Sequence, residues 1–191
     1  MITDADQNIN SNNLKSISYL HNTHVHVTFK IMPLTNVEME FLELAVELSA
    51  ENVRSGRGGP FGALVVRENV IIGRGSNSVT RTNDPTAHAE IVAIREACST
   101  IGNFQLTDCD IYSSCEPCPM CIGAIYWARP RRIIYANTAQ DAADIDFDDA
   151  FIYKELKVPE GQRSIQFVRQ SLDSALVVFQ AWENSATKVE Y

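Results

Sequence analysis

The chain has 191 residues, of which 45% are hydrophobic and 21% charged, a composition typical of one globular domain. Its net charge is −8 and its densest basic run is only "RPRR" at 129–132, which argues against a nucleic-acid partner and favours a small, weakly charged or cationic substrate. The apolar runs are too short to span a bilayer, and Asp4 and Asp6 lie where a secretory signal would carry basic residues, so we expect no membrane partner.

The first 31 residues differ in character from the rest of the chain. The segment 7–13 is polar and aperiodic, whereas "HVHVTFK" at 24–30 alternates like a short strand. We expect residues 1–31 to form a flexible, dispensable extension, with Met32 as an alternative natural start; an added edge strand is the other interpretation. Three histidines here could hold a metal, but we favour a solvated extension. They are His21, His24 and His26.

The first strong helix signal begins at Thr35, with Glu38 three residues later at the spacing of a capping box. Apolar residues then recur at helical spacing until about Ser55, and we expect the face they form to be buried. This face comprises Met39, Leu42, Val46 and Val53, widened by Leu44 and Leu48. A glycine-rich loop at 56–62 follows.

The remaining elements alternate between strands and helices. Apolar segments at 62–66 and 70–75 flank a short turn and predict a β-hairpin. The later pattern predicts a helix over 88–98, a strand over 109–114, a helix from Pro119 to about Arg129, a strand over 131–137 and a helix over 171–184. This order indicates an α/β sandwich with a mixed sheet.

Residue types that bind metals open two of these helices. "EPCPMC" places Cys118 and Cys121 at C-x-x-C spacing at a helix N-terminus, which lowers the pKa of a thiol. His88 opens the helix over 88–98, and one histidine with two cysteines leaves the fourth position of a tetrahedral zinc site open. Glu90 can lie near the metal without binding it, and can move a proton from a zinc-activated water to a substrate.

Other interpretations account for parts of this pattern. A C-x-x-C pair can be a thioredoxin-type redox pair, although that gives His88 and Glu90 no role. An H-x-E can be an ordinary helix start, and Cys115 could complete a closed structural zinc site. However, H-x-E followed about thirty residues later by P-C-x-x-C is the signature of zinc-dependent nucleobase deaminases, with the glutamate as acid and base. We favour this catalytic interpretation.

The segments "GGPFGA", "DPTAHAE", "SCEPCPMC" and "GAIYWARP" resemble the cytidine/deoxycytidylate deaminase superfamily. The late segments "FDDAFIYKE" and "FQAW" make the chain most similar to the bacterial guanine deaminases, from about residue 36 onward. The resemblance implies a three-layer α/β/α sandwich with a five-stranded mixed sheet. It implies a zinc-dependent deaminase domain over 32–155 and a C-terminal segment, 156–191, that can be exchanged between the subunits of a homodimer.

The activity that the resemblance implies is hydrolytic deamination of guanine to xanthine and ammonia in purine catabolism. It implies one zinc ion per subunit, held by His88, Cys118 and Cys121, with Glu90 as the proton shuttle. It also implies a set of substrate-binding residues: Asn77, Phe61, Ala89, Trp127, Asp149 and Tyr191.

Asp149 suits guanine chemically, because N1–H and the 2-amino group are adjacent donors that one carboxylate can accept, and adenine lacks the N1–H. Phe61 and Trp127 could contact the flat base, but core packing is an equally good interpretation of Trp127. One departure from the subfamily lies before Phe147, where Asp146 stands in a stretch that usually contains a glycine. This change could alter the loop that carries Asp149.

Several functions stay open from the sequence. The chain could be a guanosine deaminase or act on other aminopurines or aminotriazines, although closure of the pocket by Tyr191 would exclude nucleosides. In another class, it could be a non-catalytic interaction module with a structural zinc, for which Cys115 would be the fourth ligand. The chain has five cysteines, and we expect reduced thiols in the cytoplasm rather than a disulfide framework.

Overall fold

The structure is a computed structural model that describes residues 16–17, 27–28, 33–147 and 149–190. The chain divides into two compact units, Met1–Asn36 and Val37–Tyr191. In the first unit, strands β1 (Ser16–Ile17) and β2 (Val27–Thr28) pair in antiparallel fashion. The histidines of the N-terminal extension, His21, His24 and His26, lie outside the described residues.

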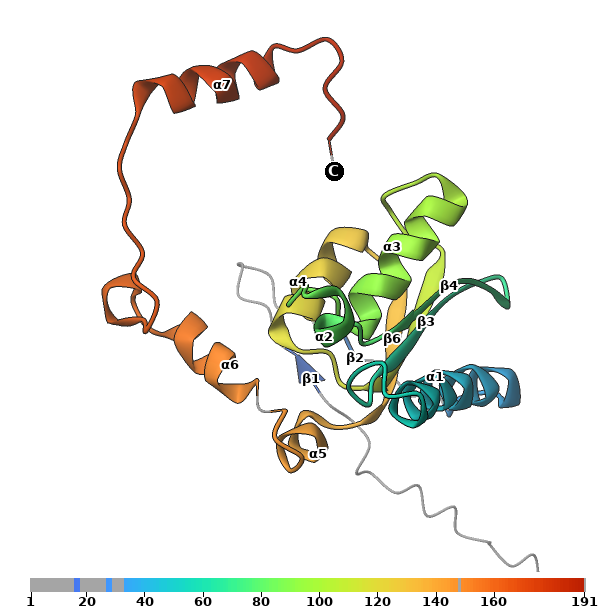
Figure 1. The fold of residues 1–191 in the computed structure, drawn as a ribbon. Coiled ribbons are helices and arrows are strands. Elements are labelled where there is room, and N and C mark those ends of the chain that lie inside the picture. The colour runs from blue at the N-terminus through green and yellow to red at the C-terminus, as the bar shows by residue number, and fades with distance from the viewer. Residues whose placement is uncertain (1–15, 18–26, 29–32, 148, 191) are drawn as a thin grey trace, which may run out of the picture. The chain divides into compact units, whose positions relative to one another are not determined.

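The second unit contains a mixed sheet of the order β4-β3-β5-β6 (Figure 1). β3 (Gly62–Arg67) lies between β4 (Val70–Ser76) and β5 (Cys109–Cys115) and is antiparallel to both. β6 (Arg132–Asn137) pairs with β5 in parallel, so the mixed sheet is confirmed.

The five strands implied by the family resemblance are not found within the described residues, where this sheet has four. The four are the strands that the sequence pattern itself predicts. After β6, Thr138 and Asp141 form a capping box that starts a helix at once, so the strand ends there. Residues 166–172 adopt neither helix nor strand, so they add no further strand to this sheet.

Helices precede, connect and follow the strands of this sheet. Their bounds are α1 (Asn36–Arg54), α2 (Val79–Thr82), α3 (Ala89–Ile101), α4 (Pro119–Ala128), α5 (Ala139–Ala143), α6 (Ala150–Lys157), the 3-10 helix η2 (Glu160–Gln162) and α7 (Asp173–Glu183). α3 and α4 end with a residue in the left-handed region, Gly102 and Arg129 respectively, and Pro130 follows the second. None of the helices in the described part of the chain has the length and apolar character needed to span a bilayer.

The β-hairpin turns at two residues with positive φ, Glu68 and Asn69 at 51° and 62°. This is the two-residue turn whose twist matches that of paired strands. The alternation along β3 then divides its side chains between two clusters. Ala63 and Val65 pack with α3, whereas Leu64 and Val66 pack with α1.

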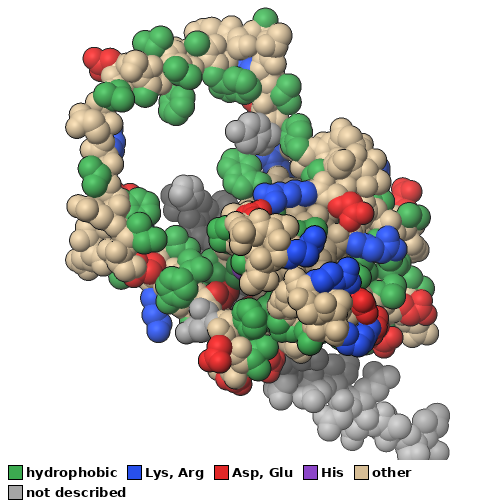
Figure 2. Space-filling view, viewed as in Figure 1, with side chains coloured by type: hydrophobic (Ala, Val, Ile, Leu, Met, Phe, Trp, Pro, Cys, Tyr) green, Lys and Arg blue, Asp and Glu red, His purple; other side chains and the backbone are tan. Residues whose placement is uncertain are grey.

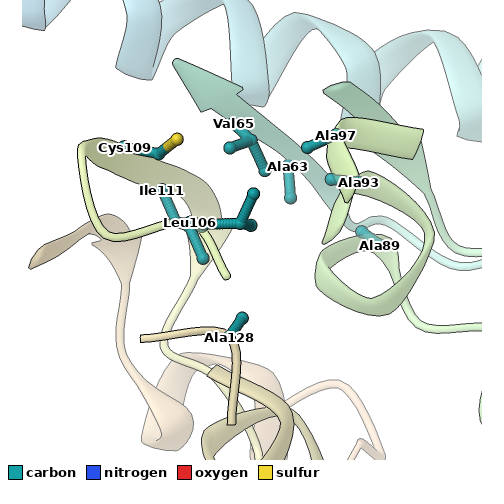
Figure 3. Packing of buried hydrophobic residues seen from close by; sticks show 9 residues of the cluster. All are labelled: Ala63, Val65, Ala89, Ala93, Ala97, Leu106, Cys109, Ile111 and Ala128. Carbon is teal, nitrogen blue, oxygen red and sulfur yellow. The ribbon is translucent and has the colours of Figure 1, made fainter. Parts of the chain in front are cut away.

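Small residues allow α3 to lie close to the sheet. Ala89, Ala93 and Ala97 belong to the same cluster as Ala63 and Val65 and are fully buried (Figure 3). Opposite them, β4 carries glycines whose backbone approaches that of α3. A Cβ at Gly73 would lie 2.3 Å from the Ala93 carbonyl oxygen, too close for a side chain. This approach fixes the height of α3 above the sheet, and so fixes the residues at its N-terminus.

The buried face of α1 matches the predicted one only in part, because Leu42 and Leu48 pack against the core whereas the other four predicted residues are exposed. Met39, Val46 and Val53 are 43–55% exposed. The helix instead buries Phe41 and Ala45, which pack with Leu64, Val66 and Tyr112. The periodicity misled because the buried row includes a polar residue, Asn52, which no apolar pattern could have marked.

Candidate active site

The predicted metal ligands lie where two helices begin side by side (Figure 1). His88 is the N-cap of α3 and Cys118 the N-cap of α4, both with extended backbone. Pro119 occupies the first turn of α4, where its missing N–H costs no hydrogen bond. Cys121 lies three residues after Cys118, still in the first turn, and is fully buried. Both helix N-termini therefore direct their positive ends at one point, which favours thiolates there.

The three side chains fit a zinc ion by their separations. The Sγ atoms of Cys118 and Cys121 lie 3.5 and 3.6 Å from His88 Nδ1, and all three ligand atoms are within 4.8 Å of one another. Ordinary Zn–S and Zn–N lengths at a tetrahedral angle place sulfur and nitrogen about 3.6 Å apart. The protein thus offers the histidine and two cysteines of an open zinc site.

Cys115 is not part of this group. Its thiol donates to the carbonyl oxygen of Thr138 at 3.5 Å, and burial raises its pKa to about 11. Among the described residues, the metal-binding group contains three ligands and no fourth. This arrangement favours the open, catalytic site over the closed structural one.

The thiols of the group are strongly coupled. The hydrogen bond from the Cys121 thiol, with a further contribution from His88, lowers the pKa of Cys118 to about 4. The same bond raises the pKa of Cys121, which holds the shared proton. Contact with Cys118 also raises the pKa of His88. One thiolate is therefore already present near neutral pH, as a cation-binding site requires.

Glu90 is buried beside the predicted metal ligands. Its Oε2 accepts from the Cys121 thiol at 3.6 Å, and its Oε1 accepts from the Ser113 hydroxyl at 3.4 Å. Burial is the main reason that the pKa of Glu90 is raised. A carboxyl group with a raised pKa can hold and release protons closer to neutral pH, as general acid–base catalysis requires.

A cavity of about 450 Å³ opens in front of this group. Its size falls in the range typical of small-molecule sites. It brings together six residues predicted for the site: His88, Glu90, Cys118, Phe61, Asn77 and Asp149. Asn77 is held by its own Oδ1, which accepts from the N–H of Val79 at 3.3 Å.

Two of the predicted substrate residues lie elsewhere, and a third is not described. Ala89 is fully buried, with its carbonyl oxygen against Gly75, and does not line the cavity. Trp127 lies on α4 outside the cavity lining and is 62% exposed. Tyr191 lies outside the described residues. Contacts of these residues with a substrate stay predictions.

The sequence analysis missed Phe147 as a site residue. Its ring meets that of Phe61 edge to face, with centroids 4.9 Å apart and planes at 88°. Gly59 makes room, because a Cβ there would lie 3.3 Å from the Phe147 ring. Asp146, just before Phe147, has a φ of 70°, in the left-handed region that glycine adopts most readily.

The comparisons with known proteins agree with this geometry. Residues 35–137 match the family model of the cytidine and deoxycytidylate deaminase zinc-binding region, and the chain belongs to this family. The guanine deaminase of Bacillus subtilis (strain 168) is 56% identical over 151 residues, which are 79% of this chain and 97% of that protein.

Solved structures give the same result. The X-ray structure of guanine deaminase from Bacillus subtilis superposes with a TM-score of 0.78 at 55% identity, over 80% of this chain and 98% of that one. Guanine deaminase from Nitrosomonas europaea superposes with a TM-score of 0.55 at 31% identity, over 57% of this chain and 63% of that one. The α/β fold of the cytidine deaminase family is therefore confirmed for this chain.

Proposed function

We propose that this protein is a guanine deaminase that hydrolyses guanine to xanthine and ammonia in purine catabolism. The observation that carries the proposal is the convergence of His88, Cys118 and Cys121 beside the buried Glu90, at one end of a cavity of small-molecule size. The identity of 56% to a guanine deaminase over 97% of its length supports this choice of substrate.

The protein's residues divide the chemistry between them. One zinc ion per subunit, held by His88, Cys118 and Cys121, would lower the pKa of water and so supply a nucleophile at neutral pH. Glu90 accepts one proton of the attacking water and delivers it to the ring nitrogen beside the amino-bearing carbon. It then accepts the remaining proton from the hydroxyl group now bonded to that carbon and transfers it to the leaving amine, so that the carbonyl of xanthine forms as the C–N bond breaks and ammonia departs. Its burial keeps bulk water from competing for these protons.

The far side of the cavity would recognise the base. Phe61 and Phe147 present an edge-to-face aromatic pair to a flat ring. Asp149 lines the cavity and can accept from both N1–H and the 2-amino group of guanine. Asn77 is a further substrate contact. Four acidic residues line the cavity: Glu90, Glu116, Asp146 and Asp149. Their negative charge disfavours a polynucleotide and suits a neutral base rich in hydrogen-bond donors.

The C-terminal segment 156–191 would complete the site in a homodimer, exchanged between subunits so that Tyr191 closes the cavity. Apolar side chains gather along α7 (Figure 2). Leu176, Val177, Val178, Phe179 and Trp182 are each at least 50% exposed in the single chain. Monomeric proteins rarely leave such a surface uncovered, and a second subunit would cover it. Trp127, exposed on α4, would be brought to the substrate in the same way.

The same proposal extends to the division of the chain into domains and to its cellular compartment. Residues 32–155 would form the deaminase domain, with helices on both faces of the sheet in a three-layer α/β/α arrangement. Residues 1–31 would be an extension without a catalytic part. All five cysteines are free, which suits a cytoplasmic enzyme.

The second candidate substrate is guanosine. The cavity of about 450 Å³ exceeds what a purine base alone requires, and so leaves room for a ribose. Closure by Tyr191 would remove that room. A structural zinc module without catalysis is the candidate of another class, and it requires Cys115 as a ligand.

The deciding experiment measures ammonia release by the zinc-loaded protein from guanine, guanosine, adenine and cytidine, with and without residues 190–191. Activity on guanine alone that is lost on truncation would support the proposal. Activity on guanosine would favour the second candidate, and bound zinc with no ammonia from any compound would favour the structural module. Mixing the truncated protein with Glu90→Gln tests the exchange, because activity returns only if an intact tail serves the other subunit's site.

A further inference from the structure

Asn52 is a buried polar residue behind the cavity rather than in its lining. It lies near the end of α1 and is 3% exposed. Its Nδ2 donates to two backbone carbonyl oxygens, those of Gly59 and Asn77, each at 2.9 Å. One side chain thus ties a helix to the loop before β3 and to the residue that follows β4.

The two partners of Asn52 are linked through Phe61, whose N–H donates to the Gly59 carbonyl oxygen at 2.8 Å. The N–H of Asn77 donates to the Phe61 carbonyl oxygen at 3.1 Å. Gly58 makes this approach possible, because a Cβ there would lie 2.2 Å from the Asn77 carbonyl oxygen. Phe61 and Asn77 both line the cavity, so the position of two proposed substrate contacts depends on one hydrogen-bonded unit behind them.

The chemistry of this unit specifies the residue type at position 52. Both partners are carbonyl oxygens, so the side chain must supply two N–H or O–H donors from one short stem. An asparagine amide does so, whereas an aspartate supplies none when ionised and a serine supplies one. A buried carbonyl that loses its donor carries a free-energy penalty, and the loop can relieve it by moving.

We propose that Asn52 is a positioning residue that sets Asn77 and Phe61 at the correct distance from the substrate. The inference rests on the proposed function, in which Asn77 and Phe61 contact the base. It assigns to α1 a part in catalysis although no α1 residue lines the cavity.

The first test compares Asn52→Asp with Ser49→Ala. Ser49 is a matched control, because its hydroxyl also ties α1 to the same loop, at the Pro60 carbonyl oxygen, but makes no bond to Asn77. A displacement of about 1 Å in a site costs on the order of 100-fold in rate. We expect Asn52→Asp to lower kcat/KM for guanine by about 10- to 100-fold at unchanged zinc content, and Ser49→Ala to stay close to wild type.

Equal losses in the two variants would overturn the proposal. Asn52→Ser keeps one donor and gives an intermediate loss, and it replaces Asn52→Asp if that variant does not fold.

A double-mutant cycle separates positioning from general loosening. In an Asn77→Ala background, removing the Asn52 donors should cost less activity than in the wild type, because one of the two contacts that they position is already gone. Full additivity of the two losses would show that Asn52 acts by some other route and would overturn the proposal.

A measurement without substrate distinguishes failure of this inference from failure of the proposed function. The Asn77 amide donates to Phe61, so its hydrogen exchange should accelerate in Asn52→Asp and stay slow in Ser49→Ala. Unchanged exchange in Asn52→Asp would overturn the inference even in an active guanine deaminase. If the wild-type protein deaminates none of the four compounds, the proposed function fails while the exchange result still decides whether Asn52 holds Asn77.

Discussion

Adding one methyl group at Gly75 should move the helix that carries His88 and Glu90. A Cβ built at Gly75 lies 1.9 Å from the carbonyl oxygen of Ala89, the first residue of α3, and 2.6 Å from the N–H nitrogen of Ala93. Both neighbours are backbone atoms, so no side chain can rotate away. An ordinary contact begins near 3.4 Å, which requires β4 and α3 to separate by about 1.5 Å.

The expected magnitude follows from this overlap. Overpacking a well-packed core lowers the free energy of unfolding by about 1–3 kcal/mol, and a clash with backbone atoms should cost about 3 kcal/mol, the upper end of this range. In a chain of this size each kcal/mol lowers Tm by roughly 2–4 °C, so Gly75→Ala should lower Tm by about 6–12 °C. Because Ala89 lies between His88 and Glu90, the same displacement should lower kcat/KM on the order of 100-fold.

The control is Gly123→Ala, an added methyl in the interior of α4 with nothing within 4 Å. That change should stabilise the protein by about 0.5–1 kcal/mol, because alanine favours the helix over glycine. Thermal unfolding, zinc content and ammonia release from guanine are measured for both variants. If Gly75→Ala unfolds at the temperature of the wild type and keeps its activity, then α3 does not lie against β4 as described.

Three further predictions concern single side chains. Glu90→Gln should keep its zinc but lose about 10²- to 10⁴-fold in kcat, and substantial ammonia release by this variant would contradict the acid–base role. Cys115→Ser should retain stoichiometric zinc by metal analysis, because its thiol lies outside the ligand group, whereas zinc loss would favour the structural module. Burial alone would raise the pKa of Asp110, but hydrogen bonds from Arg131 and Arg132 hold it below its ordinary value. The ionised Asp110 therefore stabilises the fold above about pH 4 and loses this effect as pH falls through its lowered pKa. Urea unfolding of Asp110→Asn should accordingly vary less with pH below about 4, and an unchanged acid profile would contradict the assignment.

Local pattern predicted those elements whose boundaries depend on local chemistry. The hairpin was predictable because its turn residues separate two apolar runs, and α4 because Pro119 and Pro130 delimit it. The buried face of α1 was not predictable. Its contact row contains Asn52, and four of the six apolar residues that predicted the face are exposed in the single chain: Met39, Leu44, Val46 and Val53.

The site residues also differ in whether the local sequence pattern or a contact across the fold determines their position. His88, Glu90, Cys118 and Cys121 could be found from spacing, because each lies within one turn of a helix start and spacing along a helix fixes direction. Phe147 could not, because its place in the cavity depends on a contact across the fold, with Phe61.

The residues that spacing predicts and the residue that it misses stand on parts of the fold that differ in rigidity. This difference determines which substitutions the site should tolerate. The predictable residues stand on α3 and α4, and α3 is held against β4 by backbone contacts at Gly73 and Gly75 that allow little displacement. Phe147 and Asp149 stand on the connection between α5 and α6, which tolerates substitution better than a packed core. Substitutions in that connection should therefore alter which base is accepted while zinc binding persists, whereas changes beneath α3 should remove both together.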